Sequence, residues 1–198
     1  MLLTAEGAVL LLIDLQQRLM PVIHDHETVL ARAVRLAEAA RLMDVPVIAT
    51  EQNPAGLGAT VPPLSAYPYK VLAKTAFSAA ADPGLAALLS PGLPPGAGGT
   101  AGEGGAAGGQ PGTRRDILVA GVEAHVCVLQ TVLDLLARGD RVAVAADAVG
   151  SRHPADRAVA LDRARQHGAE IVTSEMVLFE WLRDSRHPRF REVQKLLK

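Results

Sequence analysis

The feature that most restricts the fold is an unbroken apolar run, Ala8 to Ile13, that ends at Asp14. A run of this length without a polar residue is typical of a strand covered on both faces, as in a parallel sheet. Later runs of similar character complete a set of about six predicted strands. They stand at residues 45–50, 69–73, 117–120, 142–146 and 171–173.

Amphipathic segments separate these strands. Residues 27–43 place Leu, Val and Ala side chains on one face and arginines elsewhere, which is the pattern of a helix that packs on a sheet. Further helices are predicted at residues 126–138 and 154–167, each followed by a glycine. Strands that alternate with helices imply right-handed βαβ units. We therefore expect an α/β fold, a three-layer αβα sandwich with a mainly parallel sheet.

Length and composition agree with one domain. The chain has 198 residues, of which 49% are hydrophobic and 21% charged, close to the average of globular domains. Residues 91–113 differ, because they hold more than half of the 18 glycines and several prolines. Such a composition buries too little apolar surface to offset its ordering entropy. We predict a single domain over residues 1–198, with a flexible Gly/Pro-rich insertion at 91–113 that serves as a tolerated linker.

Several classes of protein are disfavoured. A formal net charge of −1 offers no large basic face for nucleic acid. The apolar run at residues 8–13 is too short to cross a bilayer, and the first residues lack the pattern of a signal peptide. The single cysteine, Cys127, forms no intramolecular disulfide. We expect a cytoplasmic protein whose partner is a small molecule, not a membrane or a nucleic acid.

Residues with chemical potential stand at the carboxyl ends of predicted strands. Ligands of open parallel sheets bind outside this edge. The residues concerned are Asp14, Glu51, Lys74, Gly121 and Asp147. Asp147 is explained well as the cap of the turn before Ser151. The others define the edge at which a reaction is to be sought.

Cys127 is the candidate nucleophile. It follows a predicted strand and begins a predicted helix, where free backbone N–H groups and the helix dipole favour a thiolate. The same N–H groups can bind an oxyanion that forms when the thiolate attacks a carbonyl. The alternative is that Cys127 is a small buried hydrophobic residue, which is how most free cysteines behave.

Asp14 and Lys74 are the candidate partners of this thiol. A carboxylate at a strand end can accept the proton of a nucleophile, although Asp in that place also caps turns. Lysine is rare in this chain, and Lys74 follows an apolar strand, so it can pair with Asp14 in a pocket. Its alternative is a solvated loop lysine. Asp14 opposes a thiolate and Lys74 favours one, so the resting state of the thiol stays open.

Ordered motifs in this chain resemble the isochorismatase-like cysteine hydrolase superfamily. They are residues 12–16 (Leu-Ile-Asp-Leu-Gln), 74–78 (Lys-Thr-Ala-Phe-Ser) and 121–128 (Gly-Val-Glu-Ala-His-Val-Cys-Val). Residues 50–58 and 187–198 are similar to the branch called isochorismatase domain-containing proteins. The resemblance implies a catalytic triad of Asp14, Lys74 and Cys127. It also implies a cis peptide bond between Val122 and Glu123, and an oxyanion hole made by the backbone N–H groups of Glu123 and Cys127.

The chain departs from parts of the superfamily. Metal-dependent nicotinamidases carry Asp and His ligands after the second strand, whereas this chain has Glu-Gln-Asn-Pro at residues 51–54. No metal and no cofactor are therefore expected. True isochorismatases often lack the nucleophilic cysteine, so Cys127 favours acyl chemistry. Gln52, Phe77 and His125 are weaker candidates for the substrate pocket.

The predicted function is that of a cysteine hydrolase for a small amide or related carbonyl compound, which forms a thioester on Cys127. Two alternatives remain open. One is an isochorismatase-type hydrolase in which Cys127 is incidental, and the other is a binding or redox-sensing module on the same fold. The resemblance also implies a homo-oligomer.

Overall fold

The computed structural model describes residues 1–89 and 116–197, and the insertion predicted at 91–113 lies outside this part of the chain. The described residues form one six-stranded sheet in the order β3-β2-β1-β4-β5-β6, with every neighbouring pair parallel. The strands are β1 (Ala8–Ile13), β2 (Val47–Gln52), β3 (Lys70–Lys74), β4 (Asp116–Val122), β5 (Arg141–Gly150) and β6 (Glu170–Val172). The predicted α/β class and parallel sheet are confirmed.

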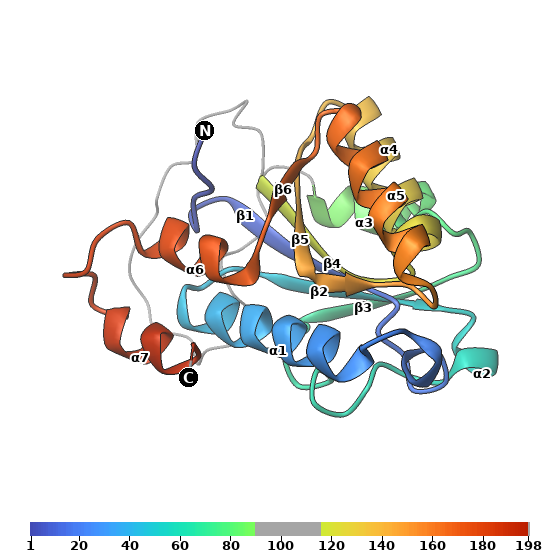
Figure 1. Ribbon diagram of the computed structural model, residues 1–198, viewed down its shortest axis with the longest axis horizontal. Helices are drawn as coiled ribbons and strands as arrows, with labels where there is room; N and C mark the ends of the chain where they lie inside the picture. The colour runs from blue at the N-terminus through green and yellow to red at the C-terminus, as the bar shows by residue number, and fades with distance from the viewer. Residues whose placement is uncertain (90–115, 198) are drawn as a thin grey trace.

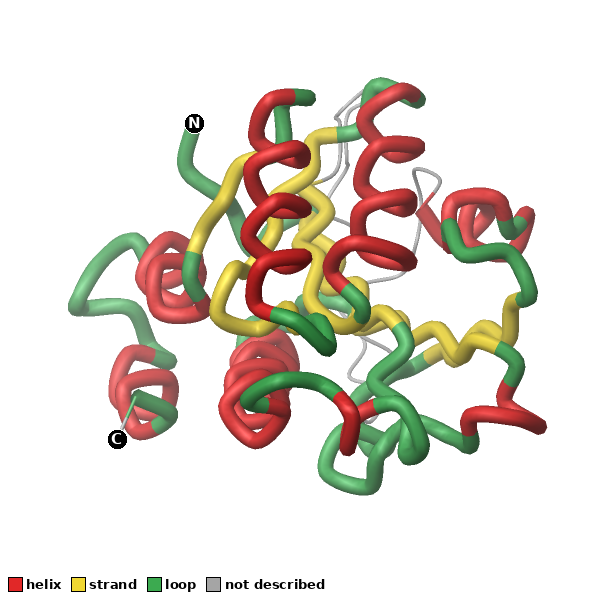
Figure 2. Tube along the Cα trace, turned by 45° about the vertical axis from the view of Figure 1, so that its right-hand side comes forward, coloured by secondary structure: helices red, strands yellow, loops and turns green. Residues whose placement is uncertain are grey.

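Helices cover both faces of the sheet, which gives the predicted three layers (Figure 1). Within the described residues the α-helices are α1 (His26–Leu42), α2 (Pro54–Leu57), α3 (Pro83–Leu89), α4 (Leu129–Ala137), α5 (Pro154–Gln166), α6 (Ser174–Leu182) and α7 (Phe190–Lys195). The side chains of α1, α6 and α7 join one hydrophobic core, and those of α3, α4 and α5 join the other. Figure 2 shows the strands as a continuous layer between these two groups.

The apolar run of β1 explains why the sheet lies in the middle. Successive side chains of a strand point to opposite faces. Leu10 and Leu12 enter the core under α1, whereas Val9, Leu11 and Ile13 enter the core under α4 and α5. All five are fully buried, so neither face of this strand has room for a polar residue before Asp14.

The strand order fixes where a ligand can bind. From β1 the chain winds outward through β2 to β3, and it then returns to the other side of β1 to form β4. The loops after β1 and β4 therefore leave the sheet in opposite directions, and such a switch point is where open α/β sheets generally bind their ligands. Asp14 follows β1, and Cys127 lies just beyond β4.

Two local predictions were wrong in detail. The helix predicted at 126–138 begins as a π-turn, Ala124–Val128, and continues as α4. Asp147 lies inside β5, which runs on to Gly150, and so it does not end a strand. Its carboxylate accepts hydrogen bonds from Ser174 N at 2.7 Å and Ser174 Oγ at 2.6 Å. Asp147 thus caps the start of α6 and not the turn before Ser151.

Candidate active site

Asp14 and Lys74 form a buried ion pair. The distance from Lys74 Nζ to Asp14 Oδ2 is 2.7 Å, and the two side chains are 2% and 0% exposed. Their strands lie on either side of β2, about 10 Å apart at the usual strand spacing. The long lysine side chain spans this distance, so the sheet brings together two residues that are far apart in the sequence.

Lys74 is surrounded by acceptors. Besides Asp14, its Nζ donates to Gln52 Oε1 at 2.7 Å, to the carbonyl of Phe77 at 3.0 Å and to that of Ala76 at 3.3 Å. An ammonium group has three protons, and these oxygens accept all of them. Lys74 is therefore held as a fixed positive charge beside Asp14.

Asp14 is held through both its carboxylate and its backbone. Thr50 Oγ1 donates to Asp14 Oδ1 at 2.7 Å, while the backbone N–H of Asp14 lies 3.2 Å from Thr50 O and 3.3 Å from Thr50 Oγ1. Asp14 has a φ of 50°, a left-handed conformation that Asp tolerates better than most residues. The turn that β1 makes here points the carboxylate toward β2 and β3.

Cys127 lies in the π-turn between β4 and α4 and is 6% exposed. Burial raises the pKa of its thiol to about 12, the negative charge of Asp14 adds to the rise, and the positive charge of Lys74 opposes it. With this raised pKa the resting thiol is protonated at neutral pH. Since both charges act on the pKa of the thiol, Cys127 lies near the Asp14–Lys74 pair.

Thr131 ties the turn of Cys127 to the segment that follows Lys74. Its fully buried hydroxyl donates to the carbonyl of Cys127 at 2.7 Å and accepts the N–H of Ala79 at 2.9 Å. A π-turn inside a helix is a frequent feature of functional sites. Here the turn and the lysine segment share one hydrogen-bonded bridge.

Glu123 begins the turn that carries Cys127. The peptide bond between Val122 and Glu123 is cis. The Glu123 carboxylate accepts from Arg152 Nε at 2.9 Å and from Arg152 N at 3.1 Å, which links the turn to the end of β5. The Glu123 carbonyl accepts from the N–H groups of Val126 and Val128.

The three weaker pocket candidates have different surroundings. Gln52 contacts the ion pair directly through its bond with Lys74. His125 lies in the same turn as Cys127, and its Nδ1 is 3.0 Å from Ser151 Oγ. The Phe77 side chain is 54% exposed, so only its backbone carbonyl belongs to the ion-pair network.

Sequence reasoning missed Thr50, Thr131 and Gln16. Gln16 is fully buried and joins the end of β2 to the next loop, through bonds with Gln52 and Gly58. Hydroxyl and amide residues are frequent in loops and strand ends, and their partners lie far away in the sequence. Only the polar character of Thr50 in an otherwise apolar strand signalled it.

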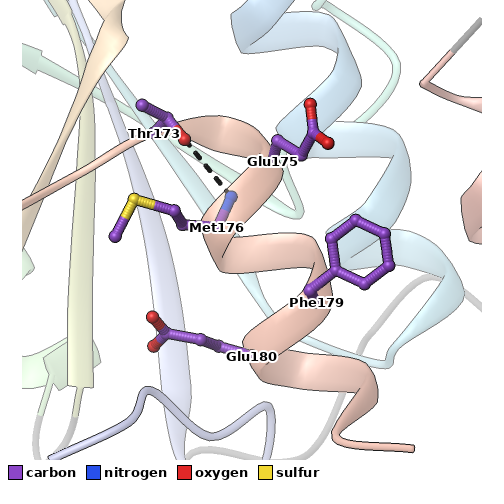
Figure 3. Close-up of a pocket in the computed structure, with 5 residues that line it drawn as sticks. All are labelled: Thr173, Glu175, Met176, Phe179 and Glu180. Carbon is purple, nitrogen blue, oxygen red and sulfur yellow. Dashed lines mark hydrogen bonds between the residues drawn. The ribbon is translucent and has the colours of Figure 1, made fainter. Parts of the chain in front are cut away.

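A surface groove on α6 lies apart from this site (Figure 3). Its lining residues are Thr173, Glu175, Met176, Phe179 and Glu180. Because α6 follows β6, at the opposite end of the strand order from β3, the groove contains none of the ion-pair residues. Across the described ranges, no cluster of three or more His, Cys, Asp or Glu side chains is arranged as a metal site. No described helix has the length and apolarity to cross a bilayer.

The fold and the site define an α/β protein with an ionised, hydrogen-bonded cluster at the switch point of a parallel sheet, the architecture of many small-molecule enzymes. The match to a family makes the class more specific. The model of the isochorismatase domain matches residues 8–92 and 110–176, so the chain belongs to the isochorismatase-like hydrolase family. The resemblance that the sequence motifs indicated is confirmed.

Named relatives agree with this family. Isochorismatase domain-containing protein 2 of Danio rerio is 40% identical over 195 residues, which cover 98% of this chain and 89% of the relative. The structure of MAR1 ribonuclease from Caenorhabditis elegans has a TM-score of 0.83 and 34% identity, with 100% of this chain and 92% of that chain covered. The Escherichia coli YcaC protein, described as an octameric hydrolase of unknown specificity, has a TM-score of 0.77 and 23% identity, with 98% and 95% covered. That last likeness shows the fold.

Proposed function

We propose that this chain is a metal-independent cysteine hydrolase for a small amide or related carbonyl compound, with Cys127, Asp14 and Lys74 as its triad. The observation that carries the proposal is the buried Lys74–Asp14 pair, whose two charges both act on the pKa of the Cys127 thiol. A buried ion pair is expensive to desolvate and contributes little net stability. Its placement beside a thiol at the sheet's switch point supports a chemical role.

Attack requires the thiol to lose its proton as the C–S bond forms. Because the resting thiol is protonated, Asp14 accepts this proton while sulfur attacks the carbonyl carbon. The electron pair of the C=O bond moves to oxygen, where the N–H groups of Glu123 and Cys127 serve as the oxyanion donors. Lys74 cannot act as the base, because the ammonium group that donates to Asp14, Gln52 and Phe77 has no lone pair with which to accept a proton.

The leaving group departs in the second half of the reaction. The C–N bond breaks as the amine takes the proton from Asp14, and a thioester remains on Cys127. Asp14 then accepts a proton from water, whose oxygen attacks the thioester carbon. When the C–S bond breaks, the acid is released and the sulfur of Cys127 takes back the proton that Asp14 accepted from water.

The test is turnover of a panel of small aliphatic and aromatic amides, with rapid quenching and intact-protein mass spectrometry. The expected result is an acyl adduct on Cys127 in the wild type. Cys127→Ser and Asp14→Asn are expected to lower turnover by at least about 10³-fold. Full turnover by Cys127→Ser would favour the isochorismatase-type reaction, in which the thiol is incidental. Reversible oxidation of Cys127 without any acyl adduct would favour the redox-sensing module.

The name of the Caenorhabditis elegans relative directs attention to RNA as another substrate. A formal net charge of −1 gives this chain no excess of positive charge to bind a phosphate backbone, which favours the small amide. A short RNA belongs in the same panel. Its cleavage by the wild type and not by Cys127→Ser would overturn the amide assignment.

A cytoplasmic location and a homo-oligomer remain part of the proposal. The single cysteine, placed in the candidate site as a free thiol, suits a reducing compartment. Exposed apolar side chains, among them Val71 at 42% and Phe179 at 45%, are the surfaces that contact between copies would cover. Light scattering of the purified protein measures the number of subunits.

A further inference from the structure

Strand β2 lies between the strands that carry the two charges of the site. Its residues Thr50 and Gln52 are two positions apart and therefore share one face of the sheet. Thr50 donates to Asp14, and Gln52 accepts from Lys74. The middle strand thus contacts each member of the ion pair through a different side chain.

The hydroxyl of Thr50 has its direction fixed. Its single proton is donated to Asp14 Oδ1 at 2.7 Å, and its lone pair faces the backbone N–H of Asp14 at 3.3 Å. Thr50 is 1% exposed, so water does not compete for this proton. One side chain therefore contacts both the carboxylate and the backbone of the same residue.

We propose that Thr50 is a positioning residue, which holds the Asp14 carboxylate correctly turned to accept the thiol proton of Cys127. The inference rests on the proposed function, because it concerns the base of the same triad. The hydrogen bond from Thr50 Oγ1 to Asp14 Oδ1 fixes the direction in which the carboxylate points. The left-handed backbone of Asp14, with φ of 50°, is also held by the bonds from its N–H to Thr50.

Two other groups contact the Asp14 carboxylate besides Thr50. Lys74, the last residue of β3, donates to Asp14 Oδ2. The thiol of Cys127, in the turn after β4, feels the negative charge of the carboxylate, which raises its pKa. With Oδ2 bound to Lys74 and Oδ1 bound to Thr50, the carboxylate cannot rotate without losing a bond. Its remaining lone pairs are then kept for the thiol proton.

The experiment measures alkylation of Cys127 by iodoacetamide, followed by intact-protein mass spectrometry between pH 5 and pH 9 or so. It needs no knowledge of the substrate. In the wild type the alkylation rate rises across this range as the thiol ionises, and Asp14 accepts the thiol proton as sulfur attacks the reagent. In Thr50→Val the rate is expected to fall by roughly threefold to tenfold at each pH, because the carboxylate has lost the bond that turns it toward the thiol. Thr50→Ser keeps the hydroxyl and is expected to restore the wild-type profile.

Thr60→Val is the matched control. Thr60 is 5% exposed and donates its hydroxyl to Glu51 Oε1 at 2.8 Å. Glu51 follows Thr50 in β2 and points to the opposite face of the sheet. This variant loses a part-buried hydroxyl bond to a carboxylate in the same strand, and its alkylation profile is expected to match that of the wild type.

The outcomes separate this inference from the proposed function. If Asp14→Asn leaves the wild-type profile unchanged, the triad and the role of Thr50 are both overturned. If Asp14→Asn changes the profile but Thr50→Val does not, the role of Thr50 alone is overturned. A loss of rate in Thr60→Val equal to that in Thr50→Val, or a failure of Thr50→Ser to restore the profile, overturns it as well. Should Thr50→Val not fold by circular dichroism, Thr50→Ala replaces it in each comparison.

Discussion

At the residue scale, the Lys74–Asp14 pair makes the site sensitive to the loss of one charge. Lys74→Met leaves the Asp14 carboxylate buried without its cation, and we expect this to lower the free energy of unfolding by about 3–5 kcal/mol. The double variant Asp14→Asn/Lys74→Met removes both charges and is expected to recover most of the loss. Urea unfolding followed by the fluorescence of Trp181 measures both. A change of less than about 1 kcal/mol in Lys74→Met would contradict the burial of the pair.

The Cys127 thiol gives a second prediction at this scale, in the dependence of stability on pH. The folded protein holds the thiol proton more tightly than the unfolded chain, since the pKa rises from 9.0 to about 12. This contribution to stability is complete below pH 9 and is lost as the pH rises toward 12. The slope is at most about 1.4 kcal/mol per pH unit.

Cys127→Ala removes the titrating group while leaving a small apolar side chain. Between pH 8 and pH 10.5 or so, the wild type is expected to lose stability relative to this variant, as measured by urea midpoints. Other groups that titrate in this range contribute equally to both proteins. Parallel curves would show that the thiol is not held protonated by the fold.

At the scale of elements, β1 and β4 approach each other where the site begins. Gly121 is paired with Ile13 in the register of the two strands, and its φ is +128°. A Cβ at this position would overlap the carbonyl oxygen of Ile13 and lie 2.6 Å from Ile13 N. Backbone atoms in the middle of a sheet cannot move away as a flexible side chain can.

Gly121→Ala is therefore expected to destabilise the fold by about 4 kcal/mol or more, or to prevent folding. Gly168→Ala is the control, because Gly168 also has a positive φ, +101°, but an added Cβ meets nothing within 4 Å. This control is expected to lose only the free energy of placing alanine in a left-handed backbone conformation, about 1–2 kcal/mol. Thermal unfolding of the two variants measures the difference. Equal losses would mean that the strands do not approach closely at Gly121.

Some elements could be predicted because their signal is local. Six apolar residues in a row predict the fully buried strand β1, and the end of the same run predicts that Asp14 lies at the edge of the sheet. The cap that Asp147 forms on α6 depends on Ser174, which is 27 positions away, so no local pattern indicates it. The π-turn at Cys127 and the contact of Thr50 with Asp14 likewise depend on strands that are neighbours only in space.

At the scale of the whole molecule, the candidate site exists only where three distant segments meet. Asp14 and Cys127 follow β1 and β4, whereas Lys74 is the last residue of β3, and the strand order of the sheet brings these three places together. The sequence motifs placed all three at one edge. The pair distances and the burial that raises the thiol pKa needed the packed structure, because they arise from helices on both faces.

The two hydrophobic cores on either side of the sheet raise the question of whether they melt together. Trp181 lies in the core under α1 and α6 and is 4% exposed, whereas α4 and α5 belong to the other core. Strands β1, β2, β4 and β5 each contribute side chains to both cores, so neither core can open without exposing the other. We therefore expect Trp181 fluorescence and far-ultraviolet circular dichroism to give the same urea midpoint and slope, as a single cooperative domain requires. Circular dichroism that retains a helical fraction after the fluorescence transition would show that the α4 and α5 face unfolds separately, and the single-domain prediction would then fail.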